Sequence, residues 1–264
     1  MNGRILHSDW GWRSSLGRYH SWWDDPEFVQ DETPGRPAYI PSTASSVMWY
    51  IGFDLGSAQE CDCFAVIAHN SYLLNASHVF VRVGVADNGS TFDQDVFKMI
   101  PTAGCEPSFM GTFTAQTKRY WELAIQHPDA SETLEVGSFL IGSSYTFDKM
   151  PDEPFSQKPE GQATRRETVA SSDTVREHGT KRRHRQVKWT AGTSTMAGQF
   201  RTIHRVHDGD FHPIAFAPHD AESLVVNTGI DAYSCELHTM ERLTISQLAD
   251  SETFDISLSL REVV

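Results

Sequence analysis

Histidines and aspartates gather in the last quarter of the chain, where their side chains are of the types that bind transition metals. The members of this group are His204, His207, His212, His219, Asp208, Asp210 and Asp220. A metal such as zinc needs three or four ligands that converge on one point. The spacing of His204 and His207 suits a helix, but the surrounding residues are typical of strand and turn. We therefore predict solvated loop residues here, with no bound metal and no other cofactor.

Motifs for catalysis and nucleotide binding are absent from the sequence. It contains no Gly-x-Ser-x-Gly elbow, phosphate-binding glycine-rich loop, His-Glu-x-x-His pair or dinucleotide fingerprint. The carboxylate pairs Asp24/Asp25 and Asp93/Asp95 lie in hydrophilic, loop-like segments. Such surroundings do not raise the pKa of one carboxyl, as general-acid catalysis requires. The prediction is that the chain is not an enzyme.

Two segments with aromatic and amide side chains are the main candidates for ligand binding. The first, SLGRYHSWWDDPEF at 15–28, has tryptophans that could stack on sugar rings or anchor an interface, or could instead close the bottom of a sandwich. The second, HNSY at 69–72, has groups suited to sugar hydroxyls, which could also satisfy their own turn. The predicted ligand-binding residues are Tyr19, Trp22, Trp23, His69, Asn70 and Tyr72.

A basic run at 181–185, KRRHR, is the candidate surface for partner docking. Its charge could attract an acidic neighbour and steer assembly in a salt-dependent way. As a nucleic-acid patch it lacks interleaved aromatic residues apart from Trp189. Basic runs of this kind are most often solvent-exposed residues at the start of a strand. We rank subunit contact above nucleic acid, and the predicted docking residues are Lys181, Arg182, Arg183 and Arg185.

The overall charge argues against nucleic-acid binding. The formal net charge is −13, with 8 Lys and Arg against 18 Asp and Glu in residues 1–148 and 14 against 17 in residues 149–264. Nucleic-acid binders are typically basic. The first residues lack the apolar run of a signal peptide, and no stretch approaches membrane-spanning length. We therefore expect a protein made in the cytoplasm, without membrane insertion.

The cysteines fit neither a disulfide framework nor a zinc site. They are Cys61, Cys63, Cys105 and Cys235. Cys61 and Cys63 share one face of a strand-like run, but no second close pair completes a set of four ligands. We expect buried free thiols in a reducing compartment.

Strand-like blocks must position these candidate residues. In the blocks 79–86 and 119–125, large apolar residues alternate with polar or small ones, which predicts strands with one buried face. Turns separate the blocks: the Asp-Leu-Gly-Ser stretch at 54–57 ends one strand, and the segment 87–90 holds an Asn-Gly pair that accepts positive φ. Hairpins and antiparallel pairing are therefore expected.

The order of these blocks resembles the discoidin, or coagulation-factor C-type, family, a galactose-binding-like jelly roll. The resemblance covers residues 40–145 and rests on the blocks 49–56, 63–68, 79–92, 119–125 and 134–142. It implies a jelly-roll β-sandwich that presents ligand-binding loops at one end. The turn reads Ala-Asp-Asn-Gly at 86–89 in place of the usual Ser-x-Asp-Gly, and no cysteine pair closes the two ends. Both departures argue against a secreted animal adhesin.

The second half of the chain is also predicted to be mainly β. The strand-like segments are 186–190, 200–206, 212–216, 223–227, 235–240 and 254–260. A hairpin-type turn is expected at 207–210. A local helix is compatible with residues 193–201, where Ala and Met favour it and Gly198 weakens it.

A change in composition near residues 142–159 suggests how the halves are joined, since Pro, Gly and charged residues combine there. The same pattern would fit a long surface crossing between two sheets. The predicted organisation is a discoidin-like sandwich at 1–148, a linker at 149–165 and a smaller β-rich assembly domain at 166–264.

The whole chain resembles minor tail or baseplate proteins of tailed bacteriophages. The resemblance rests on the jelly-roll-like first half, the Pro-rich joint and a β-rich half with a Lys-Trp strand at 188–189 and a final Leu-Arg-Glu-Val. It implies a virion structural protein of the tail tip, made in the bacterial cytoplasm. Its partners would be other tail proteins in a symmetric assembly, with a host-surface glycan as a further partner. The alternative is a non-catalytic carbohydrate-binding module of a bacterial protein.

Overall fold

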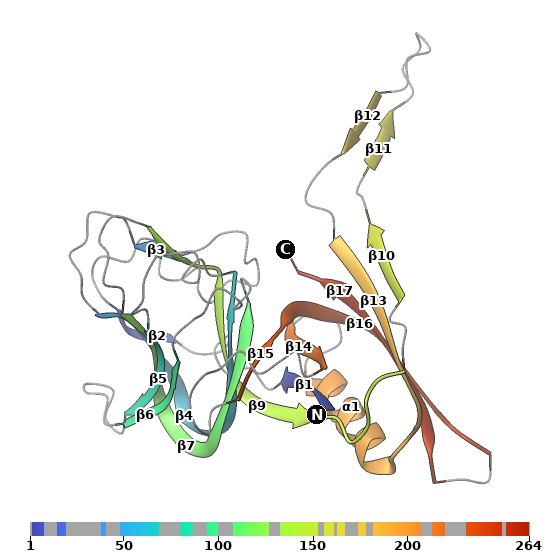
Figure 1. Ribbon diagram of the computed structural model, residues 1–264, viewed down its shortest axis with the longest axis horizontal. Coiled ribbons are helices and arrows are strands. Elements are labelled where there is room, and N and C mark those ends of the chain that lie inside the picture. Colours follow the sequence, from blue (N-terminus) through green and yellow to red (C-terminus); the bar gives the residue numbers. More distant parts are fainter. Residues whose placement is uncertain are drawn as a thin grey trace.

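Antiparallel β-strands dominate the structure, which confirms the predicted mainly-β fold (Figure 1). The computed structural model describes residues 2–7, 15–19, 38–40, 48–68, 80–86, 94–99, 108–126, 133–152, 156–160, 163–166, 174–177, 182–206, 213–219, 231–249 and 252–263. In the first half the strands are β1 (Asn2–His7), β2 (Ser15–Tyr19), β3 (Ala38–Ile40), β4 (Met48–Ile67), β5 (Phe80–Ala86), β6 (Gln94–Met99), β7 (Phe109–Gln126), β8 (Leu134–Val136) and β9 (Ser138–Thr146). The second half has β10 (Ser156–Glu160), β11 (Ala163–Arg166), β12 (Thr174–Glu177), β13 (Arg182–Gly192), helix α1 (Ser194–Val206), β14 (Ile214–His219), β15 (Asp231–Ser234), β16 (Glu236–Gln247) and β17 (Phe254–Glu262).

One sheet of 13 strands runs through both halves of the chain. Its order is β10-β13-β17-β16-β14-β1-β9-β4-β7-β5-β6, with β2 on β4 and β15 on β7. The N-terminal strand β1 lies between β14 and β9, so that Ile5 is opposite both Phe216 and Tyr145. The described residues therefore do not separate at the predicted joint of 149–165. The division into domains 1–148 and 166–264 stays a prediction.

The first half is built on the long strands β4 and β7, which pair along most of their length. β4 joins the predicted blocks 49–56 and 63–68 in one strand, and the block 119–125 forms the end of β7. Aromatic side chains fill the core between them. Phe53 and Phe139 have ring centroids 5.0 Å apart, and Phe109 meets Phe64 edge-on at 5.8 Å. The apolar alternation in these blocks thus predicted the strands correctly.

Helix α1 covers one face of the sheet in the second half. Its buried residues recur every three to four positions and are Met196, Ala197, Phe200 and Ile203. Thr193 caps the helix, because its Oγ1 accepts the backbone N–H of Met196 at 3.0 Å. The strand predicted at 200–206 is wrong, since the apolar period there is that of a helix and not of a strand. The helix expected at 193–201 is present and extends to Val206.

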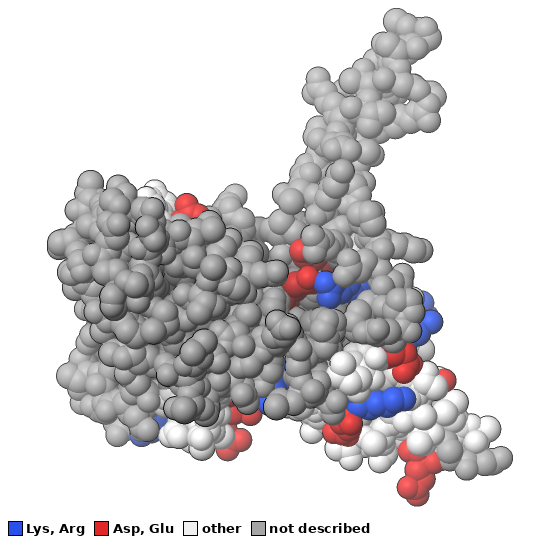
Figure 2. Space-filling view, in the orientation of Figure 1, with Lys and Arg blue, Asp and Glu red and all other residues white. Residues whose placement is uncertain are grey.

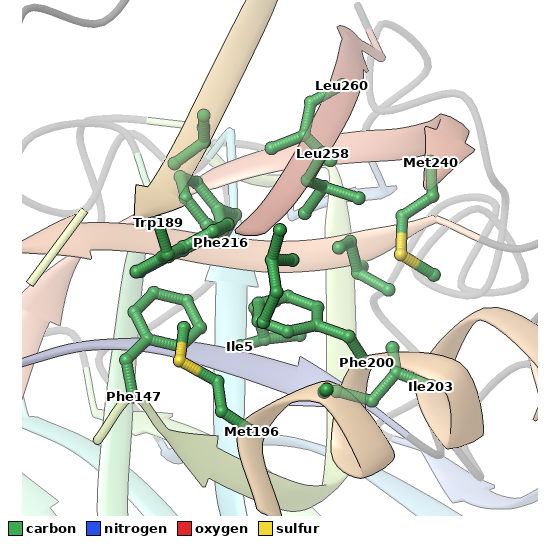
Figure 3. Packing of buried hydrophobic residues seen from close by; sticks show 14 residues of the cluster. Ile5, Phe147, Trp189, Met196, Phe200, Ile203, Phe216, Met240, Leu258 and Leu260 are labelled. Carbon is green, nitrogen blue, oxygen red and sulfur yellow. The ribbon is translucent and has the colours of Figure 1, made fainter. Parts of the chain in front are cut away.

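A second hydrophobic core lies under α1 (Figure 3). Trp189 of β13 is fully buried at its centre, with its ring centroid 4.8 Å from that of Phe200 and 5.0 Å from that of Phe147. Ile5 from the N-terminal strand belongs to the same core. The core therefore draws on residues from the two ends of the chain and from its middle.

The predicted linker at 149–165 includes two strands, β10 and β11. β10 pairs with the start of β13, and β11 pairs with β12 in a separate two-stranded sheet. In Figure 1 the β11–β12 hairpin projects away from the rest of the molecule. The strand predicted at 223–227 and the turns at 87–90 and 207–210 lie outside the described residues.

Cys61, Cys63 and Cys235 are buried free thiols, as predicted, and Cys105 lies outside the described residues. Burial raises the pKa of the Cys63 and Cys235 thiols, which keeps them protonated. Among the described residues, no helix has the length and apolar character needed to cross a membrane.

Candidate ligand-binding rim

The pairing of β4 with β7 is interrupted where both strands reach the surface. Asp54 is opposite Tyr120, whereas Gln59 is opposite Lys118. Four residues of β4 therefore lie opposite a single residue of β7, Arg119. Extra residues in one strand bend it outward and disrupt the ladder locally. The bulge forms an exposed polar corner, here called the rim, which consists of Asp54, Ser57, Gln59, Arg119 and Tyr120.

Asp54 shapes this bulge through its own backbone. Its Oδ1 accepts the N–H of Gly56 at 2.9 Å, a turn in which an aspartate bonds the amide two residues on. Gly56 has a φ of 77°, a left-handed value that glycine adopts without steric cost. The Asp-Leu-Gly stretch was predicted to form a turn, and the turn is present, although β4 continues beyond it.

Arg119 is held against Asp54 by two parallel bonds. Its Nε donates to Asp54 Oδ1 at 2.6 Å and its Nη2 donates to Oδ2 at 2.8 Å. This bidentate geometry fixes the plane of the guanidinium group. The bonds from Arg119 lower the pKa of the Asp54 carboxyl and raise that of Arg119. Both groups are therefore ionised at neutral pH.

The rim retains N–H donors that have no acceptor among the described residues. A guanidinium carries five N–H donors, and the two bonds to Asp54 occupy two of them. The others find no acceptor among the described residues, and the Arg119 side chain is 45% exposed. The guanidinium carbon also lies 4.9 Å from the centre of the Tyr120 ring. The rim thus offers fixed N–H donors beside an aromatic ring.

Two neutral polar side chains extend the rim along β4. The Nε2 of Gln59 donates to Ser57 Oγ at 2.7 Å, in an exposed position. An amide and a hydroxyl can both donate and accept, so the pair can exchange this bond for bonds to a ligand. The rim therefore combines an ion pair with groups that match the hydroxyls of a sugar.

The predicted aromatic segments fall mostly outside the described residues. Tyr19 ends β2 and is opposite Ile51 of β4, three residues along from Asp54. Trp22, Trp23 and the segment 69–72 are not described. Whether these residues bind a ligand stays a prediction. Sequence reasoning did not identify Arg119 as a site residue, although Asp54 and Arg119 both lie in the blocks that carry the discoidin resemblance.

Side chains along β13 point alternately to the core and to solvent, so neighbouring residues of the basic run differ in exposure. Residues 185, 187 and 189 are buried, while residues 186, 188 and 190 are exposed. Arg185 consequently points inward, with a side chain 8% exposed, and its Nη2 donates to Glu236 Oε1 at 2.6 Å. The guanidinium of Arg185 is therefore buried in an internal ion pair, and the partner docking predicted for this residue stays a prediction.

The other described residues of the basic run lie at the start of β13, at the root of the projecting β11–β12 hairpin. Arg182 and Arg183 are in register with Glu160 and Pro159 of β10, and Lys181 lies outside the described residues. Near this root and the end of β17, acidic and basic side chains lie side by side (Figure 2). His184 lies among these side chains, and its Nδ1 is 3.1 Å from Glu241 Oε2.

The histidines considered for a metal site occupy separate elements. His204 is on α1 and His219 ends β14, while His207 and His212 lie outside the described residues. Within the described part of the chain, no three His, Cys, Asp or Glu side chains are grouped so as to hold a metal ion.

Comparisons with known proteins give matches to solved structures only. A scan against protein families finds no match, and neither does a search of curated proteins. One similar structure is the CBM32 of AlyQ in complex with 4,5-unsaturated mannuronic acid, at 17% identity and a TM-score of 0.38, over 48% of this chain and 95% of that one. Another is CpGH89CBM32-5 from Clostridium perfringens in complex with GalNAc-β-1,3-galactose, at 11% identity and a TM-score of 0.40, over 51% and 99% of the two chains.

A third similar structure is chitosan-binding module 1 from the chitosanase/glucanase of Paenibacillus sp. IK-5, at 14% identity and a TM-score of 0.38, over 51% of this chain and 98% of that one. All three are carbohydrate-binding modules. At these scores the likeness is distant. The predicted place in a phage tail gains no support from these matches and stays a prediction.

Proposed function

We propose that the chain is a non-catalytic glycan-binding protein and that the rim around Arg119 contacts the sugar. The observation that carries this proposal is the bidentate Arg119–Asp54 pair on an exposed bulge, beside the Tyr120 ring, with N–H donors that find no acceptor in the described part of the chain. The discoidin-like order of the sequence blocks supports the same function.

The rim suits neighbouring hydroxyl groups on a sugar ring. A planar guanidinium can donate two N–H bonds to two oxygens at once. Asp54 already holds Arg119 in place, so a ligand does not bear the full entropic cost of ordering that side chain. The face of Tyr120 can cover the apolar C–H face of the same sugar. We therefore expect a neutral sugar with adjacent hydroxyls as the ligand.

The electrostatics of the rim favour binding over hydrolysis. Glycoside hydrolysis uses two carboxyl groups, one of them an acid with a raised pKa. Asp54 has a lowered pKa, so it does not supply a proton at neutral pH. Asp62 has a pKa raised by burial, but it is bound to Ser144 of β9 and is not part of the rim. The proposal therefore includes no catalytic step.

A glycan array probed with the full chain tests this function, followed by calorimetry on the glycans that bind. The Arg119→Met variant should weaken binding by at least about tenfold, the effect of losing a charge-assisted bond. Arg242→Met is the matched control, because Arg242 is an exposed arginine on β16, in the other half of the chain. Thermal unfolding of each variant verifies that it is folded.

Two outcomes would overturn parts of the proposal separately. If the wild type binds no glycan, the function is wrong. If binding is lost in Trp22→Ala and Trp23→Ala but unchanged in Arg119→Met, the chain binds glycans through the predicted aromatic segment and the rim is not the site.

A further inference from the structure

The β11–β12 hairpin and the strand pairing that leads to it form a projecting arm, defined here as residues 156–185. β10 is the last strand of the large sheet, and in the described residues it pairs only with β13. β11 and β12 pair only with each other within the same described set. Figure 1 shows the hairpin extending away from both halves of the molecule. The described strands β10, β11 and β12 therefore have open edges, and the β11–β12 hairpin projects away from both halves.

The arm differs in charge from the rest of the chain. It contains 8 Lys and Arg against 4 Asp and Glu, whereas the remaining residues contain 14 against 31. The arm thus has a net charge of +4 on a chain whose total is −13, and the body has −17. Without Arg185, which is paired with Glu236 inside the protein, the arm still has a net charge of +3. Opposite charges of this size attract over a distance of about one Debye length, roughly 10 Å at 0.1 M salt.

The same charges explain why two arms should not pair with each other. An open strand edge is a template for adding another strand, and proteins protect such edges with charged residues and proline. β10 contains Lys158 and Pro159, and the hairpin contains Arg165, Arg166 and Arg176. Two arms side by side would repel. The acidic body of another copy would attract the arm.

The root of the arm, where β10 pairs with the start of β13, is held to the large sheet. Arg185 donates to Glu236, and His184 lies within hydrogen-bond distance of Glu241, both across the sheet from β13 to β16. β13 also pairs with β17 along most of its length.

We infer that the basic arm of one copy docks on the acidic body of a second copy. Such a contact is head-to-tail, because it joins two different surfaces of the same chain. Contacts of this kind continue from copy to copy and give either closed rings or open filaments. The contact is electrostatic, so it weakens as salt is added.

Sedimentation velocity of the full chain at about 20 mM and about 500 mM salt tests the inference. The wild type should associate at low salt and return to the monomer at high salt. The arm variant Arg165→Glu/Arg166→Glu/Arg176→Glu should associate at least about tenfold more weakly at low salt. The body variant Lys188→Glu/Arg205→Glu/Arg242→Glu changes the net charge by the same amount at exposed positions, and because it makes the body more acidic it should associate at least as strongly as the wild type.

A mixing experiment separates head-to-tail docking from arm-to-arm pairing. The arm variant keeps an acidic body, so it can accept the arm of a wild-type copy but cannot donate its own. Labelled arm variant should therefore enter complexes with wild type at low salt and shorten the wild-type assemblies. A wild type that stays monomeric at low salt would overturn the inference, and so would an arm variant that associates as strongly as the wild type.

Discussion

Trp189 packs edge-on against Phe147, with ring centroids 5.0 Å apart and ring planes at 69°. Phe147 follows directly after β9, at the end of the predicted first domain, and Trp189 lies in β13 of the predicted second domain. Phe147 also contacts Phe200 of α1 and Phe216 of β14. The end of the first half is therefore an integral part of the second core.

Truncation of Phe147 should destabilise the fold as strongly as any core substitution. The side chain is 1% exposed, and Phe147→Ala leaves a cavity among four aromatic rings, which costs about 3–5 kcal/mol. Urea unfolding of the full chain measures this cost. Met150→Ala is the control, since Met150 is 40% exposed and its loss should cost less than about 0.5 kcal/mol. Equal effects of the two substitutions would show that Phe147 is not a core residue.

The strands of both halves were predictable because their apolar residues alternate over several positions. β17 is an example, with Ile256, Leu258 and Leu260 buried in alternation. The pairing of β1 with β14 was not predictable, since it joins residues more than 200 positions apart and no local pattern encodes it. The same holds for the burial of Arg185, because a basic run does not show which of its members faces the core.

The rim was only partly predictable. The turn at Asp54 follows from local chemistry, since an aspartate followed two positions later by glycine favours that turn. The partner of Asp54 is Arg119, 65 residues away, and only the register of β4 on β7 brings them together. The sequence therefore indicated the bulge but not the ion pair that it positions.

The Arg119–Asp54 pair should make stability depend on pH in the acid range. Arg119 lowers the pKa of Asp54 from its usual value of 3.8. A carboxyl with a lowered folded-state pKa adds stability above its unfolded-state value, and this stability is lost as the pH falls through the folded-state value. The Asp54→Asn variant should therefore melt below the wild type at neutral pH, and the two melting curves should converge in strong acid.

Thermal unfolding from neutral pH to below the usual aspartate pKa checks this. Glu252→Gln serves as the control, because Glu252 is an exposed carboxylate before β17. It should melt like the wild type throughout. A constant gap between wild type and Asp54→Asn at every pH would mean that the ion pair does not cause the difference.

The contribution of Asp62 to stability should depend on pH in the opposite direction to that of Asp54. Its Oδ1 accepts the backbone N–H of Ser144 at 2.7 Å, but burial raises its pKa in spite of this bond and of the nearby Arg4. A carboxyl with a raised folded-state pKa costs stability above that value, and the cost disappears as the pH falls through it. Asp62→Asn keeps an acceptor for Ser144 and removes the charge. It should melt above the wild type at neutral pH and together with it at acid pH; a lower melting point at neutral pH would contradict the assignment.

Removing Glu236 and removing Arg185 from their buried ion pair should reduce the free energy of unfolding by different amounts. The Arg185 side chain is 8% exposed and that of Glu236 is 27% exposed. Glu236 also bonds the fully buried His238, whose Nε2 is 2.9 Å from Glu236 Oε2. Glu236→Ala leaves the guanidinium charge buried without its carboxylate, which should cost about 3–5 kcal/mol.

Arg185→Met should cost less, because a methionine fills much of the same space and the remaining carboxylate of Glu236 reaches solvent. Urea unfolding of both variants compares them. Glu241→Ala is the matched control, since Glu241 also bonds a residue of β13, but that partner, His184, is 29% exposed, and the loss of Glu241 should cost less than about 1 kcal/mol. If Arg185→Met is the more destabilising variant, the arginine stabilises the sheet through its own packing and the ion pair is secondary.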